Sequence, residues 1–109
     1  MKSAVILLLL AATPALAQPR HPCAADAIAK AIPLLTLHFG EEPKPAAGID
    51  GAVKVLAPIK ALKGDGRFDV LEVLGHIYKT DYRMRFIYAQ TRGSCLLMGQ
   101  EILEVSNPY

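Results

Sequence analysis

The chain has 109 residues and a formal net charge of +2, and 52% of its residues are hydrophobic. This length suits one small domain, and the charge is too close to neutral for a strongly basic nucleic-acid-binding protein. The composition also argues against a disordered tail or a coiled coil.

The N-terminus has the pattern of a cleaved secretory signal. Lys2 gives a positive start, residues 4–12 are an unbroken apolar run, and residues 13–17 supply a helix breaker and small side chains before a cleavage point. The run is too short for a membrane-spanning helix, which needs about 20 residues. We therefore expect residues 1–17 to be removed and residues 18–109 to form one exported domain without a membrane span. The short positive start favours the bacterial periplasm.

Cys23 and Cys95 are the only cysteines, and an exported chain carries them into an oxidising compartment. An even pair without Cys-x-x-Cys spacing predicts one structural disulfide, which would close a loop of about 72 residues. The alternative is a metal site that includes His21 or His76, and it has less support because only one histidine would join each cysteine.

The segment from Cys23 to Phe39 is predicted to form a helix, with Pro22 in its first turn and Gly40 at its end. Pro33 inside the segment predicts a kink or two short helices. One apolar stripe at helical spacing is expected to face the core: Ile28, Ile32, Leu35 and Phe39. Residues 41–51 contain two prolines and two glycines and are predicted to form a loop.

The remainder predicts four strands, at 53–61, 68–79, 82–90 and 95–105, with turns at 63–66, 80–81 and 91–94. Pro58 confines the first strand to an edge of the sheet or splits it. The expected fold is α+β, with one N-terminal helix, kinked or straight, packed on a four-stranded antiparallel meander. In its element order this resembles the cystatin-like folds in outline, and the resemblance implies no function.

The register of the strands assigns side chains to the two faces of the sheet. If Thr80-Asp81 and Arg92-Gly93 centre the two hairpin turns, Phe86 lies between Gly75 and Gly99. Cys95 falls on the same face, where it can bond to Cys23. That face is expected to form the core and collects Leu71, Val73, Ile77, Tyr82, Met84, Phe86, Tyr88, Leu97 and Leu103.

The opposite face is predicted to mix apolar and hydrogen-bonding side chains. Its expected cross-strand rows include an apolar row, Leu74–Ile87–Met98, beside a polar row with His76 and Arg85, and Arg83 lies in the next row. This composition is typical of a contact surface. The predicted partner is an envelope protein or a second copy, which would form a homodimer. The alternative is a face covered by the long loop or the C-terminal tail.

Two ligand hypotheses follow from the same register. Arg83 and Arg85, with His76 and Tyr78, could hold an anion such as a carboxylate. Neutralisation across the strands, for example by Glu72 or Glu104, is the favoured interpretation. A small-molecule or anion-binding site between helix and sheet is the alternative function, with Tyr82 and Tyr88 as its polar groups.

Catalysis, cofactors and nucleic acid have little support in the sequence. There is no Ser/His/Asp setting and no glycine loop opening a helix, and His21, His38 and His76 lack metal-ligand spacing. A hydrolase or isomerase would require His76 or Asp81 in a pocket. The register sends arginines and aromatic rings to opposite faces, which disfavours nucleic-acid stacking. We therefore expect a non-catalytic binding protein without metal or cofactor.

Overall fold

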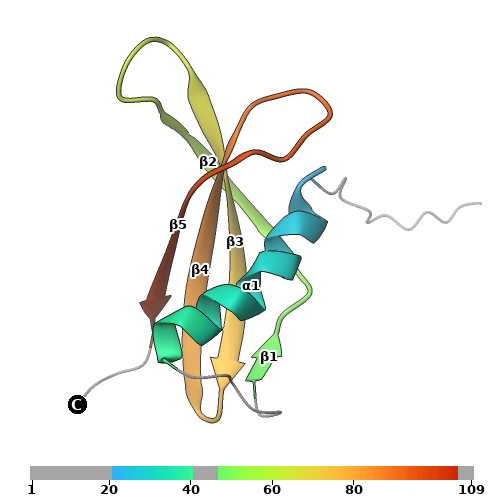
Figure 1. Cartoon of the computed structure of the whole chain (residues 1–109), viewed down its shortest axis with the longest axis vertical. Helices are drawn as coiled ribbons and strands as arrows, with labels where there is room; N and C mark the ends of the chain where they lie inside the picture. Colours follow the sequence, from blue (N-terminus) through green and yellow to red (C-terminus); the bar gives the residue numbers. More distant parts are fainter. Residues whose placement is uncertain (1–20, 41–46, 106–109) are drawn as a thin grey trace, which may run out of the picture.

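The computed structural model describes residues 21–40 and 47–105, in which one helix packs on an antiparallel sheet of five strands (Figure 1). The predicted α+β fold is confirmed, and the cystatin-like outline is compatible with it. The predicted signal at 1–17 lies outside the described residues. The elements are α1 (Ala24–Phe39), β1 (Ala47–Ile49), β2 (Lys54–Lys60), β3 (Arg67–Ile77), β4 (Thr80–Ala89) and β5 (Leu97–Glu104).

The structure has five strands where four were predicted: the predicted first strand is β2, and β1 is an additional strand that pairs with the same edge of β3 as β2 does. Part of the segment predicted as a loop is therefore β1. The Asp50 N–H donates to the Leu74 carbonyl at 2.9 Å, and the Asp50 carboxylate then accepts the Ala52 N–H at 3.0 Å. This turn lifts the chain off the edge before pairing resumes at Lys54. Near Pro58 the register of β2 shifts again, as expected of proline in an edge strand.

The hairpin between β3 and β4 turns two residues earlier than predicted. Tyr78 and Lys79 form the turn, Tyr78 has a positive φ of 56°, and Ile77 pairs with Thr80. Leu71, not Gly75, therefore lies opposite Phe86. Because the error is an even number of residues, every side chain of β3 and β4 stays on its predicted face.

A bulge at the start of β5 has the larger consequence. Tyr88 pairs with Leu97 as predicted, but Ile87 pairs with Gly99, so Met98 is an extra residue. Beyond it the faces are exchanged: Ile102 packs against the core and Leu103 is exposed. The predictions that Gly99 flanks Phe86 and that Leu103 is a core residue are wrong.

The core lies between α1 and the sheet and includes Leu71, Val73, Met84, Phe86 and Tyr88, all fully buried. The helix is continuous through Pro33 and ends at Gly40, whose φ of 92° is left-handed. The predicted helix stripe is correct only at Leu35. The buried helix residues are Ala24, Ala27, Ala31, Leu34 and Leu35, whereas Ile32 and Phe39 are exposed and Ile28 is half-buried.

Small side chains explain this orientation of the helix. Ala27 and Ala31 are fully buried, so the helix presents little bulk to the sheet. Below Leu35 lies Gly75, where a Cβ atom would stand 3.1 Å from Leu35 Cδ1. Alanine on the helix and glycine on the strand together allow a close approach that larger side chains would prevent.

The predicted disulfide is confirmed: Cys23 and Cys95 are bonded, with their Cα atoms 5.6 Å apart. The bond joins the start of α1 to the segment just before β5. Such a bond is typical of a non-reducing compartment. Among the described residues, no helix combines the length and the apolar character needed to cross a membrane.

Candidate binding surface

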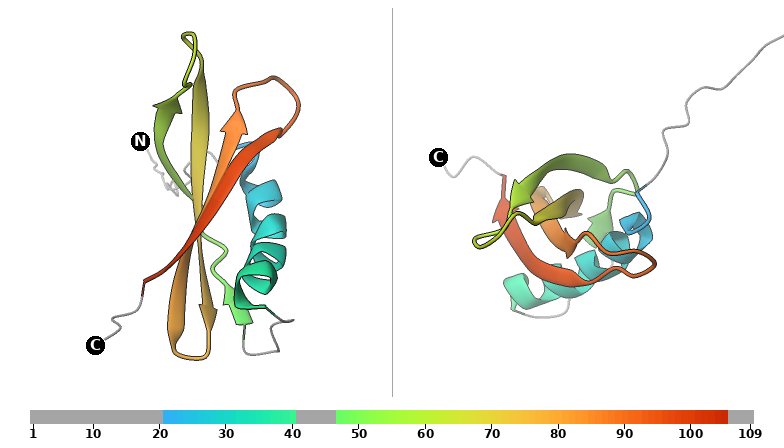
Figure 2. Two further views of the ribbon diagram at one scale, coloured as in Figure 1. Left: turned by 60° about the vertical axis from the view of Figure 1, so that its left-hand side comes forward. Right: turned by 90° about the horizontal axis from the view of Figure 1, so that it is seen from above.

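We term the face of the sheet opposite to α1 the outer face. It carries Glu72, Leu74, Arg83, Arg85 and Ile87, whose sequence neighbours on β3 and β4 point into the core. The helix α1 lies on the other side of the sheet, as the left view of Figure 2 shows. The outer face is therefore the sheet surface on which another molecule could dock.

A row of four charged residues crosses the outer face from edge to edge. The strand register aligns them as Lys54 on β2, Glu72 on β3, Arg85 on β4 and Glu101 on β5. Their charges alternate in sign along the row. The two central residues are the less exposed ones, while Lys54 and Glu101 at its two ends are exposed.

Glu72 organises the centre of this row. It is the one charged residue buried within the described chain, at 8% exposure. Arg85 Nε donates to Glu72 Oε2 at 3.0 Å, Arg83 Nε lies 3.6 Å from the same oxygen, and Arg85 Nη1 lies 4.0 Å from Glu101 Oε1. Both guanidinium groups are thus paired with Glu72. The arrangement favours cross-strand neutralisation over a free anion site.

Apolar side chains flank the charged row on both sides. One neighbouring row aligns Leu56, Val70, Ile87 and Gly99, and the other aligns Leu74, Arg83 and Leu103. Val70 is buried and Ile87 half-buried, whereas Leu74 and Leu103 are 39% and 51% exposed. Exposed leucines beside a charge cluster that is centred on one buried glutamate are consistent with a contact surface.

This arrangement corrects the predicted membership of the face. Leu74, Ile87 and Met98 do not form one row, because Leu74 lies opposite Arg83, Ile87 opposite Val70, and Met98 is the bulged residue. The exposed Met98 lies at the strand irregularity. Leu74, Ile87, Arg83 and Arg85 share the outer face as predicted.

His76 also differs from its predicted pairing. It lies opposite Asp81 instead of Arg85, and its Nδ1 is 2.7 Å from Asp81 Oδ1. Both side chains are exposed near the end of the β3–β4 hairpin. The pair does not line the hollow described below.

The tyrosines of the alternative ligand site are packed into the core. Tyr88 is fully buried, and its hydroxyl donates to Asp26 Oδ2 at 2.7 Å. Hydrogen bonds from Lys30 and Tyr88 lower the pKa of Asp26, while burial and the bond to Asp26 raise the pKa of Tyr88. Tyr82 is buried beside His38, with the two rings edge to face, and burial raises its pKa as well. Both rings are therefore part of the packed core.

The start of the helix is held by a second polar cluster. The Cys23 N–H donates to His21 Nδ1 at 2.9 Å, which leaves the ring proton on Nε2, and Nε2 lies 2.8 Å from Asp69 Oδ2. Gln90 donates to the other Asp69 oxygen at 2.7 Å, and Gln90 and His21 together lower the pKa of Asp69. Since both ring nitrogens are engaged, His21 positions the chain and does not offer a free base.

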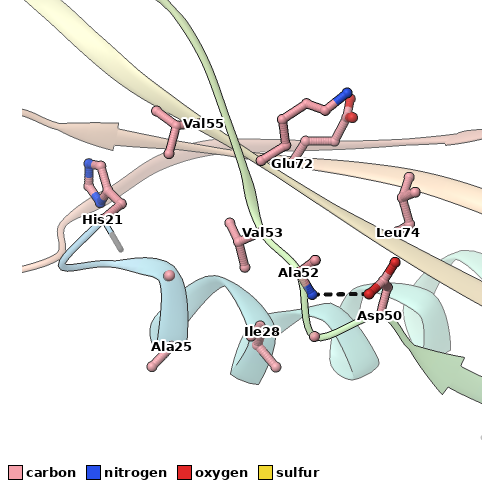
Figure 3. Close-up of a pocket in the computed structure, with 12 residues that line it drawn as sticks. His21, Ala25, Ile28, Asp50, Ala52, Val53, Val55, Glu72 and Leu74 are labelled. Atoms are coloured by element: carbon pink, nitrogen blue, oxygen red, sulfur yellow. Dashed lines mark hydrogen bonds between the residues drawn. The ribbon is translucent and has the colours of Figure 1, made fainter. Parts of the chain in front are cut away.

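An open hollow of about 720 Å³ lies beside α1, not beneath it (Figure 3). Its walls come from the first turns of the helix, the turn at 50–53, the start of β2 and the β3 edge. The larger apolar members are Ile28, Val53, Val55 and Leu74. Tyr82 and Tyr88 do not line it. Its one buried charged group, Glu72, is already paired with arginine.

Within the part of the chain that the structure describes, His, Cys, Asp and Glu form no group of three that could hold a metal ion. In comparisons with known proteins, no family model, curated protein or solved structure matches this chain. The functional interpretation therefore depends on the surface itself.

Sequence reasoning missed several members of this surface: Lys54, Leu56, Val70, Glu101 and Leu103. Leu56 and Lys54 could have been found from alternation along the first strand once its pairing with β3 was known. Glu101 and Leu103 required the bulge at Met98, for which the sequence offers only the adjacent Gly99 as a signal.

Proposed function

We propose that this protein is a small, exported, non-catalytic binding domain that docks on another protein chain through the outer face of its sheet. The observation that carries the proposal is the composition of the outer face, where the exposed Leu74 and Leu103 flank a charge cluster centred on the buried Glu72. Protein interfaces combine apolar side chains with polar groups, and arginine is enriched in them relative to the rest of the surface.

Export to an extracytoplasmic compartment, the bacterial periplasm, is part of the same proposal. Two observations support it: the signal-like residues 1–17 and the Cys23–Cys95 disulfide. Mass analysis of the protein recovered after expression tests the cleavage before Gln18. An N-terminus that begins at Met1 would contradict export by this signal.

Site-specific photo-crosslinking tests the docking face. A photoreactive residue at Leu103 on the outer face is compared with one at Leu62, which is fully exposed next to the β2–β3 turn. We expect one discrete protein adduct at position 103 and none at 62, with the attached chain identified by mass spectrometry. Equal labelling at the two positions, or none at either, would remove the support for this face.

A further inference from the structure

We infer that the chain docked on the outer face is a second copy of the same protein, stacked face to face about a two-fold axis that runs along the strands between β3 and β4. This inference rests on the proposed function and names its partner. It depends on the pattern of charge and size across the outer face.

The charged row is complementary to its own reverse. Read from β2 to β5 its charges are plus, minus, plus, minus, at Lys54, Glu72, Arg85 and Glu101. The proposed axis exchanges the two ends of the row in the second copy. Lys54 then faces the second copy's Glu101, and Glu72 faces its Arg85, so every facing pair has opposite signs.

The rows on either side of the charged row are also compatible with this two-fold rotation. Leu56 faces Gly99 of the second copy, so its large side chain lies opposite a residue that has no side chain. Val70 faces Ile87 of the second copy. In the third row, Leu74 faces the alkyl stem of Arg83. Stacked sheets cross at about 30°, which displaces the row ends by only a few ångströms, within reach of Lys and Glu side chains.

Other orientations and edges are less favourable. A two-fold axis that runs across the strands would leave each charge facing its own like. Pairing two β5 edges would place the acidic Glu101 and Glu104 of both copies together, since β5 carries no basic residue. The β2 edge is interrupted by Pro58 and its register shift. The face-to-face arrangement is the one in which charge and size agree.

A charge-swap experiment tests this pairing. Lys54 and Glu101 lie three strand spacings apart in one chain, about 14 Å, so they do not contact each other within a copy. Lys54→Glu or Glu101→Lys makes two facing pairs repulsive in each dimer, and either should raise the dimer dissociation constant about tenfold or more. The double variant Lys54→Glu/Glu101→Lys restores opposite signs and should return within about threefold of the wild type.

A matched double variant controls for net charge. Lys63→Glu/Glu101→Lys has the same net charge as the swap, but Lys63 lies in the β2–β3 turn, outside the charged row. We expect it to remain as impaired as Glu101→Lys alone. Thermal unfolding of each variant verifies that the monomer is intact, and sedimentation equilibrium measures the dissociation constants.

The outcomes separate this inference from the proposed function. Rescue by the swap and not by the control supports it. A monomeric wild type, or a dimer indifferent to all these changes, overturns it. If the Leu103 crosslink then identifies a different protein, the docking face stands and only its occupant was wrong; without any adduct at Leu103, both proposals fail.

Discussion

Gly75 lies on the core face of β3, beneath Leu35 of the helix. A Cβ atom there would stand 2.8 Å from Met84 Cε, 3.1 Å from Leu35 Cδ1 and 3.2 Å from Ile49 Cδ1. Each neighbour is a flexible side-chain end, but all three would have to move in a filled core. We expect Gly75→Ala to lower the free energy of unfolding by about 1 to 3 kcal/mol.

Urea unfolding measures this cost, and Gly48→Ala is the matched control. Gly48 lies on β1, and a Cβ atom there would meet nothing within 4 Å. Its substitution should change the free energy of unfolding by no more than about 0.5 kcal/mol. A Gly75→Ala variant as stable as the control would show that the helix does not need this close approach.

The depressed pKa values of Asp26 and Asp69 predict how stability depends on pH. Their carboxylates are stabilised in the folded state, chiefly by Lys30 and Gln90 respectively. A carboxyl whose pKa is lowered on folding contributes stability that is complete above its unfolded pKa, near 4, and is lost as pH falls through the folded value. Urea midpoints should therefore drop between about pH 5 and 2.

Asp26→Asn should reduce that drop, because residue 26 no longer titrates. The variant should also be less stable at neutral pH, since the Lys30 ion pair is lost and the buried Tyr88 hydroxyl keeps a weaker acceptor. Asp65→Asn, at an exposed turn, is the control, and its urea midpoints should drop at acidic pH as those of the wild type do. If the urea midpoints of Asp26→Asn dropped at acidic pH as much as those of the wild type, the pH dependence would belong to other groups.

At the scale of elements, the disulfide fastens the helix start to the segment before β5. It closes 72 residues of chain, for which the chain-entropy model gives about 4 kcal/mol. Cys23→Ser/Cys95→Ser should lose stability of this order, and a reductant should destabilise the wild type similarly while leaving the double variant unchanged. Unfolding midpoints with and without reductant measure both effects. A wild type insensitive to reductant while its thiols are shown to be free would contradict a stabilising role.

Local pattern was sufficient to predict the helix, the four longer strands and the two-faced character of the sheet, but not the short strand β1. Pro58, Gly40 and the alternation around Phe86 each identify a boundary or a face from nearby residues alone. The orientation of α1 was not accessible in this way, because it depends on Gly75, which is distant in sequence. A rule that places the largest apolar residues inside selects Ile28 and Ile32 over Ala27 and Ala31.

The candidate surface was predicted in part for a related reason. The two-residue error at the β3–β4 turn preserved the face of every side chain, so Arg83, Arg85, Leu74 and Ile87 were assigned correctly. The one-residue bulge at Met98 exchanged the two faces of β5 beyond it, so Glu101 and Leu103 were not predicted on the outer face. Cross-strand rows are set by register, and register depends on turn geometry that the sequence only weakly specifies.

At the scale of the whole molecule, the outer face has to be freely available for the proposed contact. Leu103→Asp places a charge at an exposed position of this face. We expect it to weaken self-association about tenfold or more while the monomer unfolds within about 0.5 kcal/mol of the wild type. Leu62→Asp, equally apolar to charged but distant from the face, should leave association intact. Similar dissociation constants for the two variants would point to another surface.

Sedimentation velocity of the disulfide-bonded protein from micromolar to millimolar concentration is the most direct single test. We predict that the molecular mass rises with concentration from one copy to two and stops there, because a two-fold contact closes on itself. Added salt should shift the equilibrium toward single copies, since facing charges contribute to the contact. A mass of one copy at every concentration, or growth beyond two, would contradict face-to-face pairing.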